Sequence, residues 1–256
     1  MRWLFALMLA SPVWGGEIGP EGMDHLPLAD VYVFGETHDN ADHHLNQARG
    51  IASSKPRAVV WEMLDEAAAG RVIPGSAMAD LDAQIGWTGS GWPEFSMYYP
   101  IFVAAGTAQH YGADVARDGL MRAMVGEIVI AGYGLDRALS PEDQAAREAE
   151  QAAAHCGMMP EDKLAGMVAV QRLRDAAIAK AVVQAMADTG GPVVVITGSG
   201  HARTDTGVPA VLRAVAPGLR VLSVGQIGGD PGGQAPFDLW IASEIPDGPD
   251  PCDAFR

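Results

Sequence analysis

The segment Val31-Tyr32-Val33-Phe34-Gly35-Glu36-Thr37-His38-Asp39-Asn40 decides the fold class of this chain. It begins as a short apolar run and ends in a glycine that charged and polar residues follow. Such a run is typical of a strand that is buried on both faces of a parallel sheet. A second segment, Pro192 to Arg203, repeats the pattern, with Gly198-Ser199-Gly200-His201 after its apolar run. The two segments predict parallel strands with functional side chains at their carboxyl ends.

The rest of the chain alternates between apolar runs and segments of helical periodicity. This alternation predicts a three-layer α/β/α sandwich with a mainly parallel sheet. Two consecutive helices near the middle of the chain are expected to pair as a helical insertion over the strand ends. The predicted strands are 31–36, 58–63, 111–116, 193–197, 219–224 and 238–242, and the main predicted helices are 41–53, 99–110, 141–155 and 160–189.

The first 16 residues have the layout of a secretory signal peptide. Met1-Arg2 is basic, Trp3 to Ala10 is apolar, and small, turn-forming residues follow. The apolar stretch is too short to span a bilayer, and no later stretch predicts a transmembrane segment. We therefore expect a single domain over residues 17–256 and a periplasmic or secreted location.

Charge and cysteine content narrow the function classes further. The chain has 17 basic and 32 acidic residues, a formal net charge of −15, which repels phosphate backbones and argues against nucleic acid as a partner. Its two cysteines, Cys156 and Cys252, form no CxxC motif. In an oxidising compartment they are expected to form a structural disulfide.

Acidic and histidine side chains follow three of the predicted strands. Glu36 and His38 end the first strand, Glu62 ends the second, and His201 follows the fourth. An isolated Glu-x-His pair is more often a buried ion pair, but ligand sites of parallel sheets gather at the carboxyl ends of the strands. Carboxylates and imidazoles placed together can bind a metal, relay protons or activate water. These four residues are the catalytic candidates.

Two further groups of side chains are candidates for ligand binding. Tyr98 and Tyr99 belong to an aromatic segment, Trp92 to Phe102, that could line a flat apolar pocket. His43 and His44 lie on the helix after the first strand, where we expect one to face solvent and the other to reach the strand ends.

With these residues in view, the sequence resembles the ChaN-like haem-binding family. That family belongs to a wider group that includes the erythromycin esterases and the Tiki and TraB proteins. The resemblance covers about residues 25–227. The segments that carry it are residues 35–40, Asp42-His43-His44, Trp61-Glu62-Met63, Trp92-Pro93, Tyr99-Pro100, His155-Cys156-Gly157, Gly198-Ser199-Gly200-His201 and Gly207-Val208-Pro209.

The resemblance implies an exported haem-binding protein linked to haem or iron uptake. It implies that a tyrosine binds the haem iron at a homodimer interface, and the sequence offers Tyr98, Tyr99 and Tyr111 for this role. The aromatic segment makes Tyr99 the first choice and Tyr98 the second. His38, His43 or His201 would then donate hydrogen bonds, and Arg203 would compensate the anionic propionates.

The wider group implies a second function, hydrolysis of an ester or amide bond. In that case Glu36, His38, Glu62 and His201 would activate water, with or without a divalent metal. A frame for a serine nucleophile is missing around Ser199.

Overall fold

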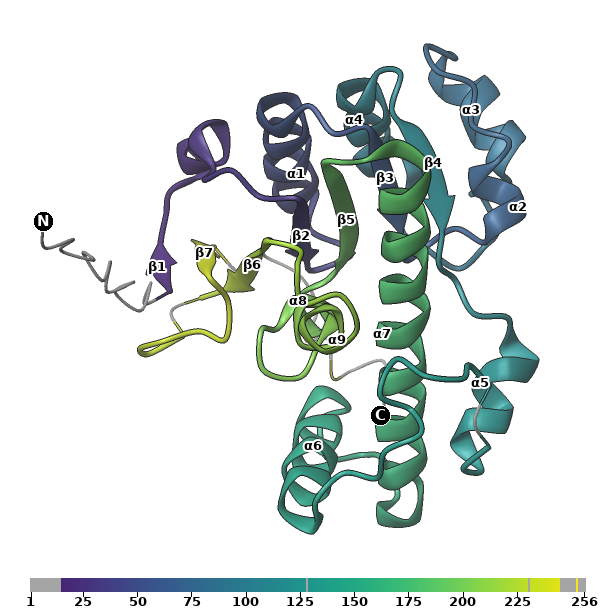
Figure 1. Ribbon diagram of the computed structural model, residues 1–256, viewed down its shortest axis with the longest axis vertical. Helices are drawn as coiled ribbons and strands as arrows, with labels where there is room; N and C mark the ends of the chain where they lie inside the picture. The colour runs from purple at the N-terminus through teal and green to yellow at the C-terminus, as the bar shows by residue number, and fades with distance from the viewer. Residues whose placement is uncertain (1–14, 128, 230, 245–251, 253–256) are drawn as a thin grey trace, which may run out of the picture.

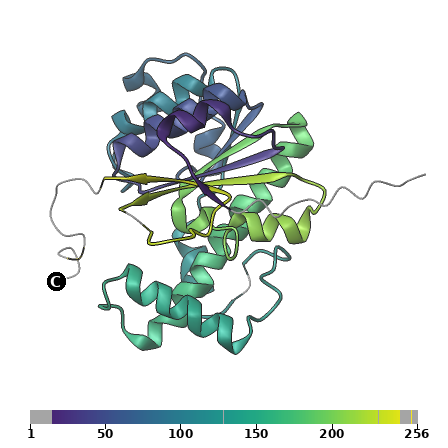
Figure 2. The same ribbon diagram turned by 90° about the vertical axis from the view of Figure 1, so that its left-hand side faces the viewer.

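The computed structural model describes residues 15–127, 129–229, 231–244 and 252. Within these residues, seven strands form one parallel sheet in the order β1-β7-β6-β2-β5-β3-β4. Helices cover both of its faces (Figures 1 and 2), which is the expected three-layer sandwich. The strands are β1 (Gly16–Glu17), β2 (Val31–Glu36), β3 (Ala58–Trp61), β4 (Gln109–Gly112), β5 (Val193–Gly198), β6 (Val221–Gly228) and β7 (Leu239–Ser243).

The central strands β2 and β5 are buried along their whole length. Strand β5 and the first half of β2 are rich in valine, because a strand that helices cover on both faces has no side for polar residues. Their register runs from Val31 beside Val193 to Glu36 beside Gly198. The polar segments that follow the two strands therefore leave the sheet at the same edge.

Helices connect the strands, and side chains cap two of the longer ones. The Asn40 side chain accepts a hydrogen bond at the start of α1, and the Ser140 side chain does so at the start of α6. The described helices are the 3-10 helix η1 (Pro20–His25), α1 (Ala41–Ser54), α2 (Glu66–Ala69), α3 (Met78–Ile85), α4 (Phe95–Ala105), α5 (Arg117–Met124), α6 (Pro141–Ala154), α7 (Glu161–Thr189), α8 (Ser199–Ala202) and α9 (Val208–Val215).

Each face of the sheet has its own hydrophobic core. On one face, Phe34 and Trp61 pack against α1 and α4, and the rings of Trp61 and Phe102 stack with centroids 4.1 Å apart. On the other face, Val195 packs with Ile178 of α7 and with residues of α9. Side chains at the strand ends can thus be reached from both helical layers.

Helix α6 and the first half of α7 extend past the sheet as a helical insertion, as both views show (Figures 1 and 2). Helix α6 contributes no buried residue and lies along α7. A disulfide joins Cys156, just after α6, to Cys252. The predictions of a helical insertion and of this disulfide are confirmed.

The predicted leader, residues 1–16, lies outside the described residues except for its last two positions. Gly16 belongs to β1 and pairs with Leu239 of β7. Sequence reasoning missed β1, because a strand of two residues has no recognisable pattern. No described helix is both long and apolar enough to cross a membrane.

Three elements differ by several residues from the sequence expectation. The strand predicted over 219–224 is β6, Val221–Gly228. The helix predicted over 99–110 is α4, Phe95–Ala105, and the strand predicted over 111–116 is β4, Gln109–Gly112. Helix α4 ends at Gly106, whose φ of +57° favours glycine. Strand β4 begins with polar residues, because it is at the edge of the described sheet and needs no continuous apolar run.

Candidate functional site

The structure brings the four strand-end candidates together. Glu36 ends β2, Glu62 follows β3, and His201 lies on α8 directly after β5. Helix α8 lies very close to β2. A Cβ atom at Gly35 would be only 2.9 Å from the Cα of Ser199, so the close approach requires a glycine at position 35. Two carboxylate–histidine pairs result.

The first pair joins Glu36 and His38. The Nδ1 atom of His38 lies 2.7 Å from Oε1 of Glu36, which is almost wholly buried. The Tyr98 hydroxyl donates to the same oxygen, and His44 Nε2 lies 3.4 Å from it. Burial alone would raise the pKa of Glu36, but the hydrogen bonds from His38 and His44 outweigh it and lower that pKa. Glu36 is therefore a buried carboxylate that fixes the imidazole of His38.

His38 is the member of this pair that reaches solvent. Its side chain is 32% exposed, and its ring lies 4.9 Å from that of Trp92. Burial would lower the pKa of His38, but the hydrogen bond with Glu36 and the charge of Glu62 raise it. Because Nδ1 faces Glu36, Nε2 points toward Gly198, where an added Cβ would be 3.0 Å away. Within the described residues Nε2 has no hydrogen-bond partner.

The second pair joins Glu62 and His201. Oε2 of Glu62 accepts hydrogen bonds from the Thr197 hydroxyl at 2.7 Å and from the Gly198 N–H at 2.8 Å. Its other oxygen lies 3.3 Å from Nε2 of His201 and 3.6 Å from Arg174. Burial alone would raise the pKa of Glu62. The charge of His201 and the hydrogen bonds to the carboxylate outweigh burial and hold this pKa well below its usual range.

His201 is held between two buried carboxylates. Its Nδ1 lies 2.7 Å from Oδ1 of Asp175 on α7. Burial would lower the pKa of His201, but the charges of Glu62 and Asp175 raise it to about 10. The ring is therefore an imidazolium at neutral pH, with no lone pair for a metal. It adds a fixed positive charge to the site.

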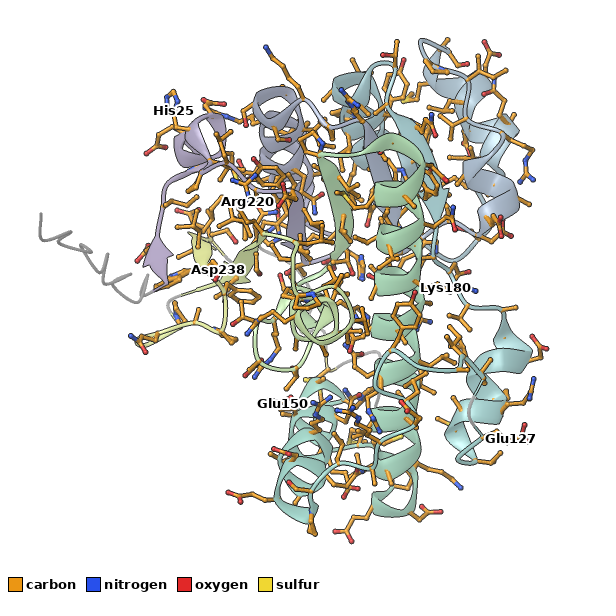
Figure 3. All side chains as sticks on the ribbon, in the orientation of Figure 1. His25, Glu127, Glu150, Lys180, Arg220 and Asp238 are labelled. Atoms are coloured by element: carbon orange, nitrogen blue, oxygen red, sulfur yellow. A yellow bond between two sulfur atoms is a disulfide. The ribbon has the colours of Figure 1, made fainter. Side chains whose placement is uncertain are left out.

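These residues open onto a cavity of about 630 Å³ between the strand ends and the helical insertion. Its wall carries both charge signs, and Arg203 of the wall pairs with Glu150 of α6 and with Asp205. Figure 3 shows Glu150 on α6, on the side nearest α8 and α9. The lining residues are His38, Glu62, Trp92, Arg147, Glu150, Gln151, Ala154, His155, Met167, Val168, Val170, Gln171, Arg174, Asp175, Gly200, His201, Arg203 and Thr206.

The two candidate tyrosines do not line this cavity. Tyr98 is fully buried beside Glu36, and burial with the nearby Glu36 charge raises its pKa far above the usual range. Tyr99 points to a separate apolar cavity of about 470 Å³, and its hydroxyl donates to the backbone oxygen of Ser76 at 3.1 Å. The Tyr98 hydroxyl lies 3.4 Å from Nδ1 of His38, on the Glu36 side of the ring, and the Tyr99 hydroxyl faces the second cavity.

Half of the expectation for the paired histidines on α1 was wrong, because neither faces solvent, whereas His44 does reach Glu36 at the end of β2. His43 accepts the Thr37 N–H at Nδ1 and lies 2.8 Å from the Ser243 hydroxyl at Nε2, and burial lowers its pKa to about 4. The His44 ring packs against the Tyr98 ring in a tilted arrangement, with centroids 4.0 Å apart. Both histidines therefore lie in the buried surroundings of the Glu36–His38 pair, where His43 binds the backbone at Thr37 and His44 contacts Glu36.

Sequence reasoning missed the residues that α6 and α7 contribute. Asp175 holds His201, and Arg174 and Arg147 line the cavity. Asp175 and Val168 both lie on the buried side of α7. A charged residue on an otherwise apolar helix face could have indicated that Asp175 has a role in the site. No cluster of three or more His, Cys, Asp or Glu side chains in the described part of the chain has the geometry of a metal site.

Comparisons with known proteins identify relatives of this fold. Among curated proteins, none matches the chain. ChaN of Campylobacter jejuni, in a structure described as cofacial haem binding, matches with a TM-score of 0.63 and 19% identity over 79% of this chain and 83% of that chain. The type III effector HopBA1 matches with a TM-score of 0.45 and 13% identity over 84% of this chain and 88% of that chain. The similarity to ChaN shows a common fold.

A family model described as haem-binding uptake, Tiki superfamily, ChaN matches residues 23–212. That range contains β2 to β5, the helical insertion and all four strand-end candidates. The chain therefore belongs to the haem-binding uptake family of the Tiki superfamily, which includes ChaN.

Proposed function

We propose that this protein binds haem in the strand-end cavity, with His38 as the iron ligand. Membership of the family supports haem as the ligand. The cavity volume of about 630 Å³ is within the ordinary range for small-molecule sites. Trp92 and Met167 offer it apolar surface, and three arginines offer positive charge for the propionates. Bound haem would supply a ferric iron, which His38 would hold.

The observation that carries the proposal is the orientation of His38. Metal-binding histidines commonly donate their second ring N–H to a carboxylate, which fixes the tautomer and makes the ligating nitrogen more basic. Glu36 accepts at Nδ1 in this way, so that Nε2 of this cavity-lining residue keeps its lone pair. His201 does not fit the ligand role, because its Nδ1 faces Asp175 and its Nε2 faces Glu62, and the charges of both acids raise its pKa. Its charge, with that of Arg203, suits the anionic edge of the haem.

Tyr99 remains the alternative iron ligand. Its separate cavity is apolar and also contains Phe102 and His110. Ligation there would require the phenol to leave Ser76, whereas His38 needs no rearrangement of its hydrogen bonds. This difference favours His38.

Water-activating hydrolysis is the second candidate function, and one observation favours it. The Glu36–His38 pair has the arrangement of a general base that a carboxylate orients, at the wall of a charged cavity. A divalent metal could assist it only with ligands from outside the described cluster.

We further propose that the protein acts after export, in haem or iron uptake, as a homodimer. The disulfide supports export, because such bonds persist in oxidising compartments. The family resemblance supports the dimer, which sedimentation analysis with and without haemin tests.

Titration of the purified protein with haemin, followed by the Soret band, tests the haem proposal. We expect a saturable, shifted band for the wild type, and His38→Gln should weaken binding by at least about tenfold, because an axial ligand is lost. Tyr99→Phe is the matched control and should bind like the wild type. If Tyr99→Phe loses the band and His38→Gln keeps it, the iron is bound in the second cavity. If no variant or wild type binds, the haem proposal is wrong.

A further inference from the structure

Among the residues that the structure describes, Arg147 is a cation without a partner at the strand-end cavity. It lies on α6, and its Nε atom is buried with no hydrogen-bond partner. Within the described residues it makes no hydrogen bond or ion pair. The other arginines of the wall differ, since Arg174 lies 3.6 Å from Glu62, and Arg203 pairs with Glu150 and Asp205.

The surroundings of Arg147 leave its charge uncompensated. The positive charge of Arg147 lowers the pKa of Asp175, but this carboxylate is already hydrogen-bonded to His201. Burial lowers the pKa of Arg172, and the nearby positive charge of Arg147 lowers it as well. Arg172 donates hydrogen bonds to the backbone oxygens of Gly134 and Arg137, so it does not compensate the charge of Arg147. Burying part of a guanidinium without a partner is unfavourable. In a chain with 32 acidic and 17 basic residues, an unpaired arginine at a cavity indicates a ligand with a negative charge.

We infer that Arg147 binds a carboxylate of the cavity ligand. A guanidinium has two parallel N–H groups that match the two oxygens of a carboxylate, and one of its donors here is buried and unused. The inference rests on the proposed function for the identity of the ligand, in which the carboxylate is a haem propionate. Arg147 is thus a specificity-determining residue that selects free haem over forms without a negative charge.

The first test compares haemin with haemin dimethyl ester, which lacks the carboxylates. We expect the wild type to bind haemin at least about tenfold more tightly than the ester, because hydrogen bonds between charged groups are among the strongest. Arg147→Gln should abolish most of this preference. The control is Arg122→Gln on α5, whose partner Glu127 lies away from α6 (Figure 3) and which should keep the preference. A preference that Arg147→Gln leaves unchanged overturns the inference.

The second test needs no haem and uses the wild-type protein. The Nε–H signal of Arg147, identified by its loss in Arg147→Gln, is followed by NMR during titration with sodium propionate. A saturable shift of this signal that is absent for Arg122 is expected. If haemin does not bind, the proposed function is wrong, and the propionate titration alone then decides whether Arg147 binds a carboxylate. A signal of Arg147 that does not move, or that moves no more than that of Arg122, overturns the inference.

Discussion

Below its raised pKa, His38 carries a second ring proton that haem iron would have to displace. The Glu36 hydrogen bond and the charge of Glu62 raise the pKa of His38 despite its burial. Iron needs the neutral ring, so binding releases a proton and strengthens as the pH rises through this raised pKa. We predict that haemin affinity increases from about pH 6 to a plateau above the ordinary histidine pKa of about 6.5. Soret titrations at several pH values measure it.

The control for this pH dependence is His38→Gln, which cannot titrate. Its residual haemin affinity should change much less over the same range. If affinity instead falls as the pH rises, or if the variant keeps the full pH dependence, another group binds the iron.

Tyr98 has a structural role in this account. Its hydroxyl donates to buried Glu36 and does not reach the cavity. We predict that Tyr98→Phe lowers the free energy of unfolding by about 1–3 kcal/mol, the usual cost of a lost buried hydrogen bond to a charged group, and leaves the haem spectrum unchanged. Urea denaturation measures the first effect. Tyr99→Phe, which loses only a bond to the partly buried Ser76, should cost less.

The sequence indicated the site residues that follow strands. Glu36, His38, Glu62 and His201 could be found because parallel strands end at one edge of the sheet, so that position along the chain predicts position in space. The residues from the helices could not be found in this way. Whether Arg147 or Asp175 faces the strand ends depends on how α6 and α7 pack, and a single sequence does not specify that packing.

At the scale of the elements, the disulfide holds α6 and the C-terminal region together. Helix α6 has no buried residue, so packing against the core contributes little to its position. The two cysteines are 96 residues apart, a loop for which the chain-entropy model gives a stabilisation of about 4.7 kcal/mol as an upper figure. We predict that Cys252→Ser lowers the free energy of unfolding by up to this amount, as measured in urea.

Counting the reactive thiols of the unreduced protein tests whether the Cys156–Cys252 disulfide forms. Unreduced wild-type protein should have no reactive thiol, and the Cys156→Ser, Cys252→Ser double variant should be as stable as the single variant. Two reactive thiols in the wild type, or equal stability of wild type and Cys252→Ser, would contradict this role.

The sequence predicted the long elements better than the short ones. Helix α7 was predicted over 160–189 and is Glu161–Thr189, because a long periodic pattern averages out local exceptions. Strand β4 was displaced and β1 was missed, because each pairs with the described sheet on one side only and has few apolar residues. Their positions depend on partners that are distant in the chain.

At the scale of the whole molecule, the sheet provides one wall of the cavity and the insertion provides the other. Ala154 of α6 lines the cavity with its small side chain, and the adjacent Ala153 is exposed and does not. A tryptophan at position 154 should fill space that a haem would occupy. A tryptophan at position 153 should project away from it. The two variants therefore differ in the cavity alone.

The measurement that tests the central claim most directly is a haemin titration of the wild type, Ala154→Trp and Ala153→Trp under identical conditions. We predict one haem per chain for the wild type and Ala153→Trp, and at least about tenfold weaker binding for Ala154→Trp, since the site is sterically blocked. Tight haemin binding by Ala154→Trp, equal to that of the wild type, would contradict the assignment of the strand-end cavity as the haem site.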